Sequence, residues 1–465
     1  MSSKSLTKAA AARRRAANPY SLGSALINGG PLVWASCLLM GLGNFAAGQI
    51  IKGLLFLAIE ALVIWYMLTN GLYWLQMFPS LGWREESEVF NEELGYFEYV
   101  MGDNSQQILL YAVATMAIIV AFIVIWRASV RSGYEALCIK RSGKRVPKFW
   151  DDIKALFDKN VHKLLMTVPF LSLVIFTMIP LVYMMMMAFT NYSKVGGHLV
   201  LFDWVGFENF KSIFSSKSAI SEQFWSVLGW TLIWAFFATF LNFFFGTFVA
   251  MIINRPTTKL KGVWRTILSL TIAVPQFVSL LIIRTMLQEQ GIVNSTLITN
   301  GFITEGNELP FWSDTTWARI TIIIVNLWVG IPYTVMQVTG ILKNIPADLY
   351  EAARIDGANV VQQFMNITLP YMIFVLTPHI ITSFTGNINN FNIIYLLSGG
   401  GPVKRLDYTA GSTDLLVTWL YKLTIDNLQY NLAAVIGILT FIILAIVSLV
   451  TYRSSGSYKD EEGFK

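Results

Sequence analysis

Three polar residues recur at helical spacing in the otherwise apolar stretch 369–390. Ser383, Asn387 and Asn390 follow one another at intervals of four and three residues, which places them on one face of a helix. An amide or hydroxyl inside a lipid bilayer is costly unless it finds a partner or faces water. The stripe therefore marks either a contact with another helix or the wall of a polar site.

A second polar stripe lies in the apolar stretch 317–341. Asn326, Gly330, Tyr333 and Gln337 are separated by four, three and four residues. Such residues often join membrane helices by hydrogen bonds. Contacts of this kind would explain either stripe taken alone. A sugar site needs the same groups, because amides bind hydroxyls, an aromatic ring covers the apolar sugar face and glycine permits close approach. Two stripes on neighbouring helices predict a pocket near mid-membrane.

Other reactive side chains do not suggest a second kind of site. His162, His198 and His379 are far apart in the sequence, so no metal site is expected, and His379 favours a packing role over ligand contact. No G-x4-G-K run followed by Ser or Thr occurs, so the chain is not expected to bind ATP. No nucleophile and base stand out as a pair. We therefore expect no catalytic residue, no metal and no cofactor bound by this chain.

The stripes must be carried by membrane helices. The chain has 465 residues, of which 55% are hydrophobic and 13% charged, and its mean hydropathy is +0.55. Soluble proteins average about 25% charged residues. The sequence predicts an all-α polytopic membrane protein with about eight transmembrane helices. The apolar runs of spanning length are 53–69, 107–126, 163–188, 225–253, 264–288, 317–341, 369–390 and 432–451.

The distribution of charge orients these helices. Basic residues crowd the N-terminus and segment 127–163, whereas loop 70–106 is acidic and has Arg84 as its one basic residue. The positive-inside rule places the first two in the cytoplasm and the loop outside. An odd number of crossings must separate the cytoplasmic N-terminus from the outer loop 70–106. The run 53–69 supplies one crossing, so the stretch 31–50, which glycines interrupt, is interpreted as interfacial or re-entrant. Both termini are then cytoplasmic, and the net charge of +6 records orientation rather than nucleic-acid binding.

The cytoplasmic loop 343–370 has an unusual composition. Pro346 opens a short run of helix formers that contains Glu351–Ala353, and Gly357 then permits a sharp change of direction. Small alanine side chains would let such a helix enter a groove on another protein. An ordinary amphipathic connector between two membrane helices is the alternative.

The pattern Glu-Ala-Ala, x3, Gly, x9, Ile, x, Leu, Pro resembles the coupling loop of ABC-importer permeases. All seven defining positions match, from Glu351 to Pro370. The resemblance implies a six-helix permease core driven by separate ATPase subunits, which hold ATP and Mg. It also implies that this chain meets the ATPase through Glu351, Ala352, Ala353, Arg354, Asp356 and Gly357.

Longer stretches resemble the larger permease subunit of maltose/maltodextrin importers. The similarity covers about 160–451 and is most specific in four segments, 326–333, 381–391, 399–402 and 410–417. The short loop 189–224 is similar to that of the Gram-positive type. By this resemblance the sugar contacts fall on Val329, Gly330, Tyr333, Ser383, Asn387 and Asn390.

Charge and resemblance together predict the domains and partners. Expected partners are a second homologous permease subunit, two ATPase subunits and an extracellular sugar-binding lipoprotein, in a bacterial cell membrane. The expected domains are a basic N-terminus (1–30), an accessory membrane segment (31–150), a transmembrane domain (160–452) with its coupling loop (343–370), and a cytoplasmic tail (453–465).

Two alternatives to maltodextrin import are open. One is a raffinose- or lactose-type oligosaccharide within the same class; a glycerol phosphate would need cationic residues, which the two stripes lack. The other is an ion-coupled secondary sugar carrier, which should have a titratable carboxylate in its core helices and no use for the coupling loop. Glu60, inside 53–69, is interpreted as a helix-pairing residue rather than as such a carboxylate.

Overall fold

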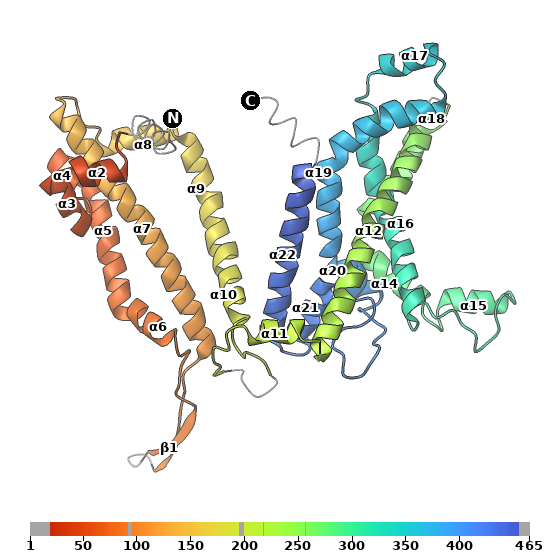
Figure 1. Ribbon diagram of the computed structural model, residues 1–465, viewed down its shortest axis with the longest axis horizontal. Helices are drawn as coiled ribbons and strands as arrows, with labels where there is room; N and C mark the ends of the chain where they lie inside the picture. The colour runs from red at the N-terminus through yellow and green to blue at the C-terminus, as the bar shows by residue number, and fades with distance from the viewer. Residues whose placement is uncertain (1–18, 92–94, 195–199, 217, 256, 455–465) are drawn as a thin grey trace, which may run out of the picture. The chain divides into compact units, whose positions relative to one another are not determined.

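The chain is predominantly helical, as predicted (Figure 1). The computed structural model describes residues 19–91, 95–194, 200–216, 218–255 and 257–454. Its contacts define two compact units, unit 1 (1–191 and 198–204) and unit 2 (192–197 and 205–465). The sequence-based boundary between 150 and 160 rests in part on a resemblance and stays a prediction.

The described part of unit 1 begins with three short helices, and both long and short helices follow them. A π-helical turn (Met67–Gly71) joins α5 to α6, and another (Val174–Met178) joins α9 to α10. The stretch 31–50 forms α3 and α4, each too short to span a bilayer. The helices are α2 (Leu22–Asn28), α3 (Pro31–Leu38), α4 (Leu42–Ala47), α5 (Ile50–Tyr66), α6 (Leu72–Met77), α7 (Ser105–Arg141), α8 (Phe149–Phe157), α9 (Val161–Leu173) and α10 (Ile179–Met187).

Close backbone approach and one buried carboxylate hold the short helices in place. A Cβ atom on Gly43 of α4 would lie 3.0 Å from the Cα of Gly133 in α7, so the two helices touch at these glycines. In α5 the Glu60 side chain is buried, and its Oε2 accepts a hydrogen bond of 2.8 Å from the backbone N–H of Met40. Glu60 therefore stabilises the chain break between α3 and α4, in keeping with a helix-pairing role.

A β-hairpin occupies the predicted outer loop 70–106. Strands β1 (Ser87–Asn91) and β2 (Tyr96–Val100) pair antiparallel, with Ser87 opposite Val100. Asp103 fixes the base of the hairpin. Its Oδ2 accepts hydrogen bonds from the backbone N–H groups of Trp83 and Arg84, at 3.0 and 3.1 Å, and its Oδ1 accepts from the Arg84 guanidinium.

Unit 2 carries both polar stripes and the coupling loop. A π-helical turn (Phe364–Thr368) joins α18 to α19. The helices are α11 (Glu208–Phe214), α12 (Ala219–Asn254), α13 (Lys261–Ala273), α14 (Gln276–Met286), α15 (Ile292–Thr299), α16 (Thr315–Leu342), α17 (Ala347–Ile355), α18 (Val360–Gln363), α19 (Leu369–Ile388), α20 (Phe391–Leu397), α21 (Leu416–Ile425) and α22 (Tyr430–Ser454).

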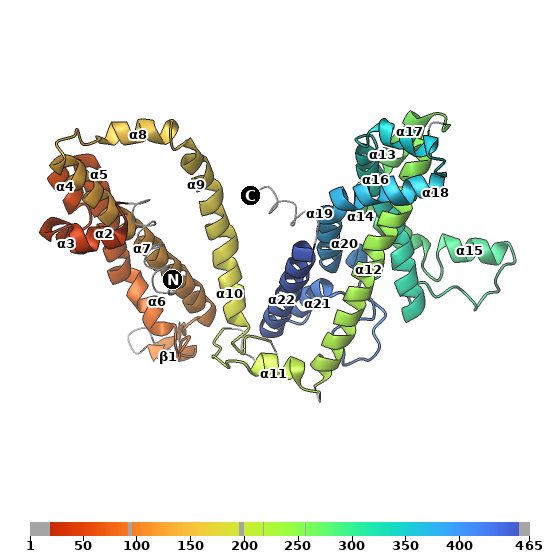
Figure 2. The same cartoon turned by 45° about the horizontal axis from the view of Figure 1, so that its top comes forward.

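The core of unit 2 is built on α12, which packs against both α16 and α19 (Figure 2). Near one end, Trp234 of α12 and Ile322 of α16 are fully buried in one apolar cluster. Farther along, α12 and α16 approach closely, because a Cβ atom on Gly246 would lie 2.4 Å from the Cβ of Thr334. A second cluster, which includes Met372 of α19, closes the core there.

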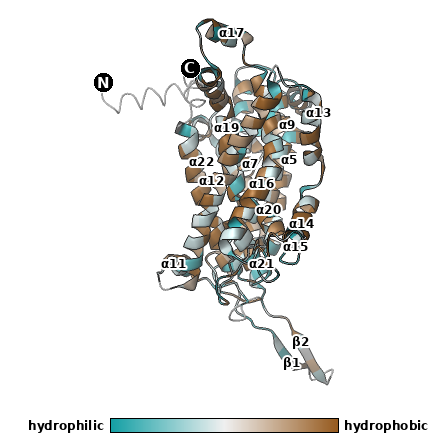
Figure 3. Ribbon diagram, turned by 90° about the vertical axis from the view of Figure 1, so that its right-hand side faces the viewer, coloured by the Kyte–Doolittle hydropathy of each residue, from teal (hydrophilic) through white to brown (hydrophobic). Residues whose placement is uncertain are grey.

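Seven of the eight predicted crossings are confirmed as helical segments long and apolar enough to span a membrane. Hydrophobic residues cover most of the long helices (Figure 3). Within the described part of the chain these segments are Ile50–Met77, Ser105–Arg141, Val161–Met187, Ala219–Asn254, Thr315–Leu342, Val360–Leu397 and Tyr430–Arg453.

The eighth predicted crossing, 264–288, is broken. α13 and α14 meet at an angle of 87°, so the stretch counts as a crossing only if the bent pair forms one span. The break falls at Val274, whose backbone is extended, with φ −74° and ψ 129°. Pro275 follows it, and a proline disfavours helical backbone at the preceding residue and lacks the N–H that would continue the helix.

Candidate functional site

A cavity of about 280 Å³ lies among α12, α16 and α19. Its volume is near the lower end of the roughly 300–1,000 Å³ typical of small-molecule pockets. All three helices contribute polar groups as well as apolar ones. The lining residues are Ala238, Thr239, Asn242, Phe243, Gly330, Tyr333, Thr334, Gln337, Leu376, His379, Ile380, Ser383 and Asn387.

The α19 wall carries one predicted stripe. Asn387 donates a hydrogen bond of 3.0 Å from Nδ2 to the Thr239 hydroxyl, and its backbone carbonyl accepts one of 3.0 Å from the Trp234 indole. Both contacts join α19 to α12, and the first orients the side-chain amide. Ser383 Oγ lies 3.1 Å from His379 Nε2, one turn away. His379, for which a packing role is expected, lies on the same face of α19 as Ser383 and also lines the cavity.

The α16 wall carries the second stripe. Gly330, Tyr333 and Gln337 all line the cavity. Gly330 is required by a close contact, since a Cβ atom there would lie 2.2 Å from Asn242 Nδ2. Asn326, at the start of the stripe, is instead buried, with 3% exposure, and does not line the cavity.

Two of the six predicted sugar contacts lie outside the lining. Val329 lines a smaller neighbouring pocket with Trp328 and packs against an apolar cluster. Asn390 caps α20, where its Oδ1 accepts a hydrogen bond of 3.4 Å from the Ile393 N–H, and its Nδ2 donates to Asn387 Oδ1 at 3.3 Å. Gly330, Tyr333, Ser383 and Asn387 are brought together, and the roles of all six stay predictions.

The α12 wall was not anticipated from the sequence. Thr239 and Asn242 line the cavity opposite the two stripes. The sequence did contain one signal, the amide of Asn242 within the long apolar run 225–253. A polar side chain in a membrane helix is costly and therefore marks a candidate functional site.

The cavity is polar but carries no acidic or strongly basic side chain. None of its lining residues is Asp, Glu, Lys or Arg. Hydroxyls, amides, an imidazole and the Tyr333 phenol supply hydrogen-bond donors and acceptors instead. Such a wall suits a neutral ligand rich in hydroxyl groups and gives no counter-ion for a phosphate.

The coupling loop forms a short helix at one end of unit 2 (Figure 1). α17 ends where Gly357 adopts a left-handed φ of +78°, which favours glycine. Tyr350 ties α17 to the N-terminal end of α19 through a hydrogen bond of 2.8 Å to the Thr368 hydroxyl. The side chains of Glu351 and Ile355 are exposed, and the latter is 87% accessible. An exposed apolar side chain on such a helix is available for contact with another protein.

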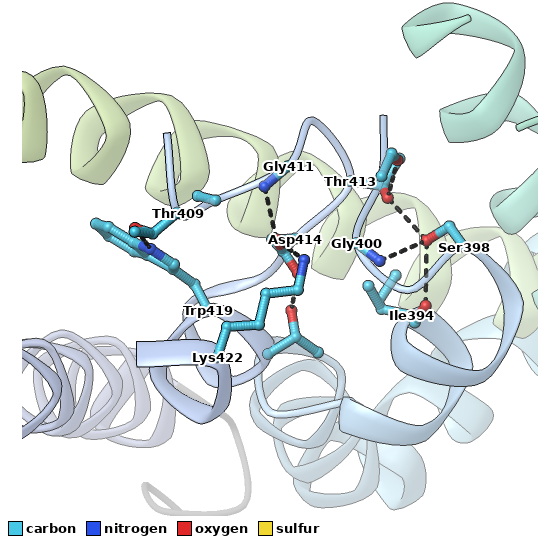
Figure 4. A network of polar contacts seen from close by, with 12 residues as sticks. Ile394, Ser398, Gly400, Thr409, Gly411, Thr413, Asp414, Trp419 and Lys422 are labelled. Atoms are coloured by element: carbon cyan, nitrogen blue, oxygen red, sulfur yellow. Dashed lines mark hydrogen bonds and ion pairs between the residues drawn. The ribbon is translucent and has the colours of Figure 1, made fainter. Parts of the chain in front are cut away.

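A buried polar network holds the loop between α20 and α21 (Figure 4). Asp414 Oδ2 accepts from Lys422 Nζ at 2.6 Å and from the Gly411 N–H at 2.7 Å, and its Oδ1 accepts from the Thr418 hydroxyl at 2.9 Å. Burial raises the pKa of Asp414 above its ordinary value, although the contact with Lys422 opposes that rise. The two sequence segments 399–402 and 410–417 meet in this network. Their residues therefore stabilise the fold of the loop.

A cavity with polar groups among apolar helices of spanning length, with an exposed helix on a loop, is the arrangement expected of a multi-pass membrane permease. The family model for the inner membrane component of binding-protein-dependent transport systems matches residues 242–455. With the relatives described next, this match shows that the chain belongs to that family, and it confirms the ABC-permease resemblance found in the sequence.

Two Bacillus subtilis (strain 168) permeases match almost the whole chain. One is the galactooligosaccharides transport system permease protein GanP, 34% identical over 91% of this chain and 97% of its own length. The other is the maltodextrin transport system permease protein MdxF, 34% identical over 91% of this chain and 95% of its own length.

A solved structure shares the fold. It is a bacterial alginate ABC transporter in complex with an alginate pentasaccharide-bound periplasmic protein. The matched chain superposes with a TM-score of 0.52 and 22% identity, over 65% of this chain and 95% of that one. The all-α permease fold predicted from the sequence is confirmed.

Proposed function

We propose that this chain is the pore-forming permease subunit of an ATP-driven importer for neutral oligosaccharides of the maltodextrin type. The observation that carries the proposal is the cavity among α12, α16 and α19, whose polar lining has no acidic side chain and no Lys or Arg. Amides and hydroxyls there match sugar hydroxyls, and Tyr333 offers a ring for an apolar sugar face. MdxF, by its name, serves maltodextrin transport.

The proposed assembly supplies what this chain lacks. A second homologous permease completes the pathway, two ATPase subunits bind ATP and Mg, and an extracellular lipoprotein delivers the sugar. α17, with Glu351–Ala353 and Asp356 exposed or half-exposed, docks on an ATPase and couples its closure to the cavity. The assembly lies in a bacterial cell membrane with both termini of this chain in the cytoplasm.

Uptake of labelled oligosaccharides tests the substrate. Cells lacking the chain, cells with the wild-type chain and cells with Asn387→Ala are compared, using maltotetraose and a galactotetraose in parallel. Chain-dependent uptake of maltotetraose that falls in the variant supports both the substrate and the site, because Asn387 lines the cavity. Chain-dependent uptake of the galactotetraose alone would replace maltodextrin by galactooligosaccharide, the substrate in the name of GanP.

A glycine substitution in the coupling loop tests the energy source. Gly357→Leu places a side chain at a left-handed φ of +78°, where strain is expected whatever the surrounding space. Gly143→Leu is the matched control, since Gly143 has a φ of +71° and also has open space around it, in the loop after α7. An ATP-driven importer should lose ATPase binding and uptake with Gly357→Leu only.

Equal uptake by the two glycine variants would argue for the rival, an ion-coupled secondary carrier. That rival is disfavoured by the cavity, because its lining offers no carboxylate to bind a coupling ion.

A further inference from the structure

Asn242 presents an unusual amide to the cavity. Its Nδ2 donates a hydrogen bond of 2.7 Å to the Ala238 carbonyl, one turn back along α12. Its Oδ1 is buried and has no hydrogen-bond partner among the described residues. The orientation follows from the donor, because a flipped amide would place its oxygen against the Ala238 carbonyl, and two acceptors repel.

A second asparagine on the same helix provides the comparison. Asn254 also donates a hydrogen bond of 2.7 Å from Nδ2 to the carbonyl one turn back, that of Ala250. Its Oδ1, however, accepts a hydrogen bond from the Arg265 guanidinium. The two side chains donate the same hydrogen bond from Nδ2. They differ in that Oδ1 of Asn254 has a hydrogen-bond donor within the described part of the protein and Oδ1 of Asn242 does not. Buried polar atoms are normally hydrogen-bonded, and Asn242 lines the cavity, so its oxygen is available to a hydrogen-bond donor bound there.

Asn242 lies at the cavity wall, where it packs against Gly330 of α16. Gly330 faces the amide, and a Cβ atom there would lie 2.6 Å from Asn242 Oδ1 and 2.2 Å from Nδ2. Both residues line the cavity. The absence of a side chain at Gly330 thus lets α16 pack directly against the amide of Asn242, whose N–H is already used, and the cavity beside the pair is where a partner for Oδ1 would lie.

We infer that Asn242 is a specificity-determining residue whose Oδ1 accepts a hydrogen bond from one hydroxyl of the transported sugar. The inference rests on the proposed function, because it assigns a contact within the same cavity. Asn242 Oδ1 can only accept, so the ligand must bring a donor. A sugar hydroxyl does, whereas a ring oxygen, a glycosidic oxygen or a deoxygenated carbon does not.

The test is a scan of singly deoxygenated maltotetraoses on the complete transporter in proteoliposomes. Wild type is expected to show, for one particular deoxy position, a rise in KM on the order of tenfold with little change in maximal rate. Asn242→Leu keeps the branching of the side chain, with a larger volume, and removes the acceptor. In this variant the KM for maltotetraose should rise by a similar factor, and the penalty at that one deoxy position should vanish while the others persist.

Thr247→Val is the matched control. Thr247 is also a buried residue of α12 whose hydroxyl has no hydrogen-bond partner among the described residues, but it lies outside the cavity. Its substitution should leave every deoxy penalty as in wild type. Size-exclusion chromatography of each complex shows whether the variant assembles, and Asn242→Ser, which restores a smaller acceptor, serves if the leucine variant does not.

The outcomes separate the two proposals. A wild-type transporter that carries sugar and an Asn242 variant whose deoxy penalties are all unchanged would overturn the role of Asn242 and leave the proposed function standing. If the transporter carries a galactotetraose instead, the deoxy scan is made on that sugar and read in the same way. A wild-type transporter that carries neither sugar would overturn the proposed function, and the role of Asn242 as a sugar acceptor with it.

Discussion

Lys422 Nζ lies 2.6 Å from Asp414 Oδ2, and both side chains are withdrawn from solvent, with 15% and 0% exposure. The pair joins α21 to the loop that precedes it. A Cβ atom on Gly400 would lie 1.9 Å from Asp414 Oδ1, so the loop segment that begins at Gly399 passes directly over the carboxylate. The ion pair and this backbone contact hold the two loop segments together.

Asp414→Asn should therefore destabilise the protein strongly. Removing one partner of a buried ion pair leaves the other charge uncompensated, which typically costs about 3–5 kcal/mol. The control is Asp407→Asn, which removes an exposed ion pair with Arg405 at 2.9 Å, where a loss of about 0–1 kcal/mol is expected. Tryptophan fluorescence during denaturant unfolding of the detergent-solubilised protein measures both. Equal effects of the two substitutions would contradict a structural role for the buried pair.

Asp103 should make the stability of unit 1 sensitive to acid. Its burial tends to raise its pKa, but hydrogen bonds from the backbone of Trp83 and Arg84 and the charge of the Arg84 guanidinium outweigh burial and lower the pKa below the ordinary value. A carboxyl whose folded-state pKa is depressed adds stability above its unfolded pKa, near 3.9, and this stability is lost as pH falls through the folded-state value.

The acid sensitivity can be measured as the unfolding midpoint between about pH 6 and pH 3. Asp103→Asn should lower the midpoint most at the upper end of this range and flatten its dependence on pH. Asp158→Asn, at an exposed aspartate after α8, is the control and should leave the pH profile unchanged. A wild-type profile that Asp103→Asn does not flatten would contradict the assigned role of Asp103.

Assembly of the transporter should depend on the hydrogen-bond acceptor of the Glu60 side chain and not on its charge. The side chain is buried in α5 and accepts the Met40 N–H at 2.8 Å. Glu60→Gln keeps an acceptor and should preserve both assembly and uptake. Glu60→Leu leaves the Met40 N–H unsatisfied, at a typical cost of about 1–3 kcal/mol, and should reduce the amount of assembled transporter. Normal assembly but abolished uptake in Glu60→Gln would instead point to a role of the charge in transport.

Helical spacing predicted the cavity-lining residues correctly only where the residues compared lie in one continuous helix. Ser383 and Asn387 share a face of α19 and both line the cavity, but α19 ends at Ile388. Asn390 therefore caps α20, although its spacing from Asn387 fits a helix. Val329 precedes Gly330 by one residue, which turns it about 100° around the helix and away from the cavity.

The parts that the sequence did not predict depend on contacts between distant segments. Asn242 has one polar neighbour at helical spacing, Thr239, which makes a pair rather than a stripe, and its place beside Gly330 is set by the crossing of α12 and α16. The bend between α13 and α14 had a local signal, since Val274 precedes Pro275, but hydropathy alone treats the stretch as one continuous run. Hydropathy thus predicted seven long helical segments correctly and missed the break in the eighth.

Gly330→Ala should impair uptake without impairing assembly. The added Cβ would meet the whole amide of Asn242, at 2.2 Å from Nδ2 and 2.5 Å from Cγ, and the bond from Nδ2 to the Ala238 carbonyl opposes a shift of that amide. Gly340→Ala, on the same helix, adds a methyl group into open space and should have no effect. Uptake of labelled oligosaccharide per assembled complex should fall on the order of tenfold for Gly330→Ala only. If the two alanine variants transport equally well, the contact between Gly330 and Asn242 does not shape the substrate site.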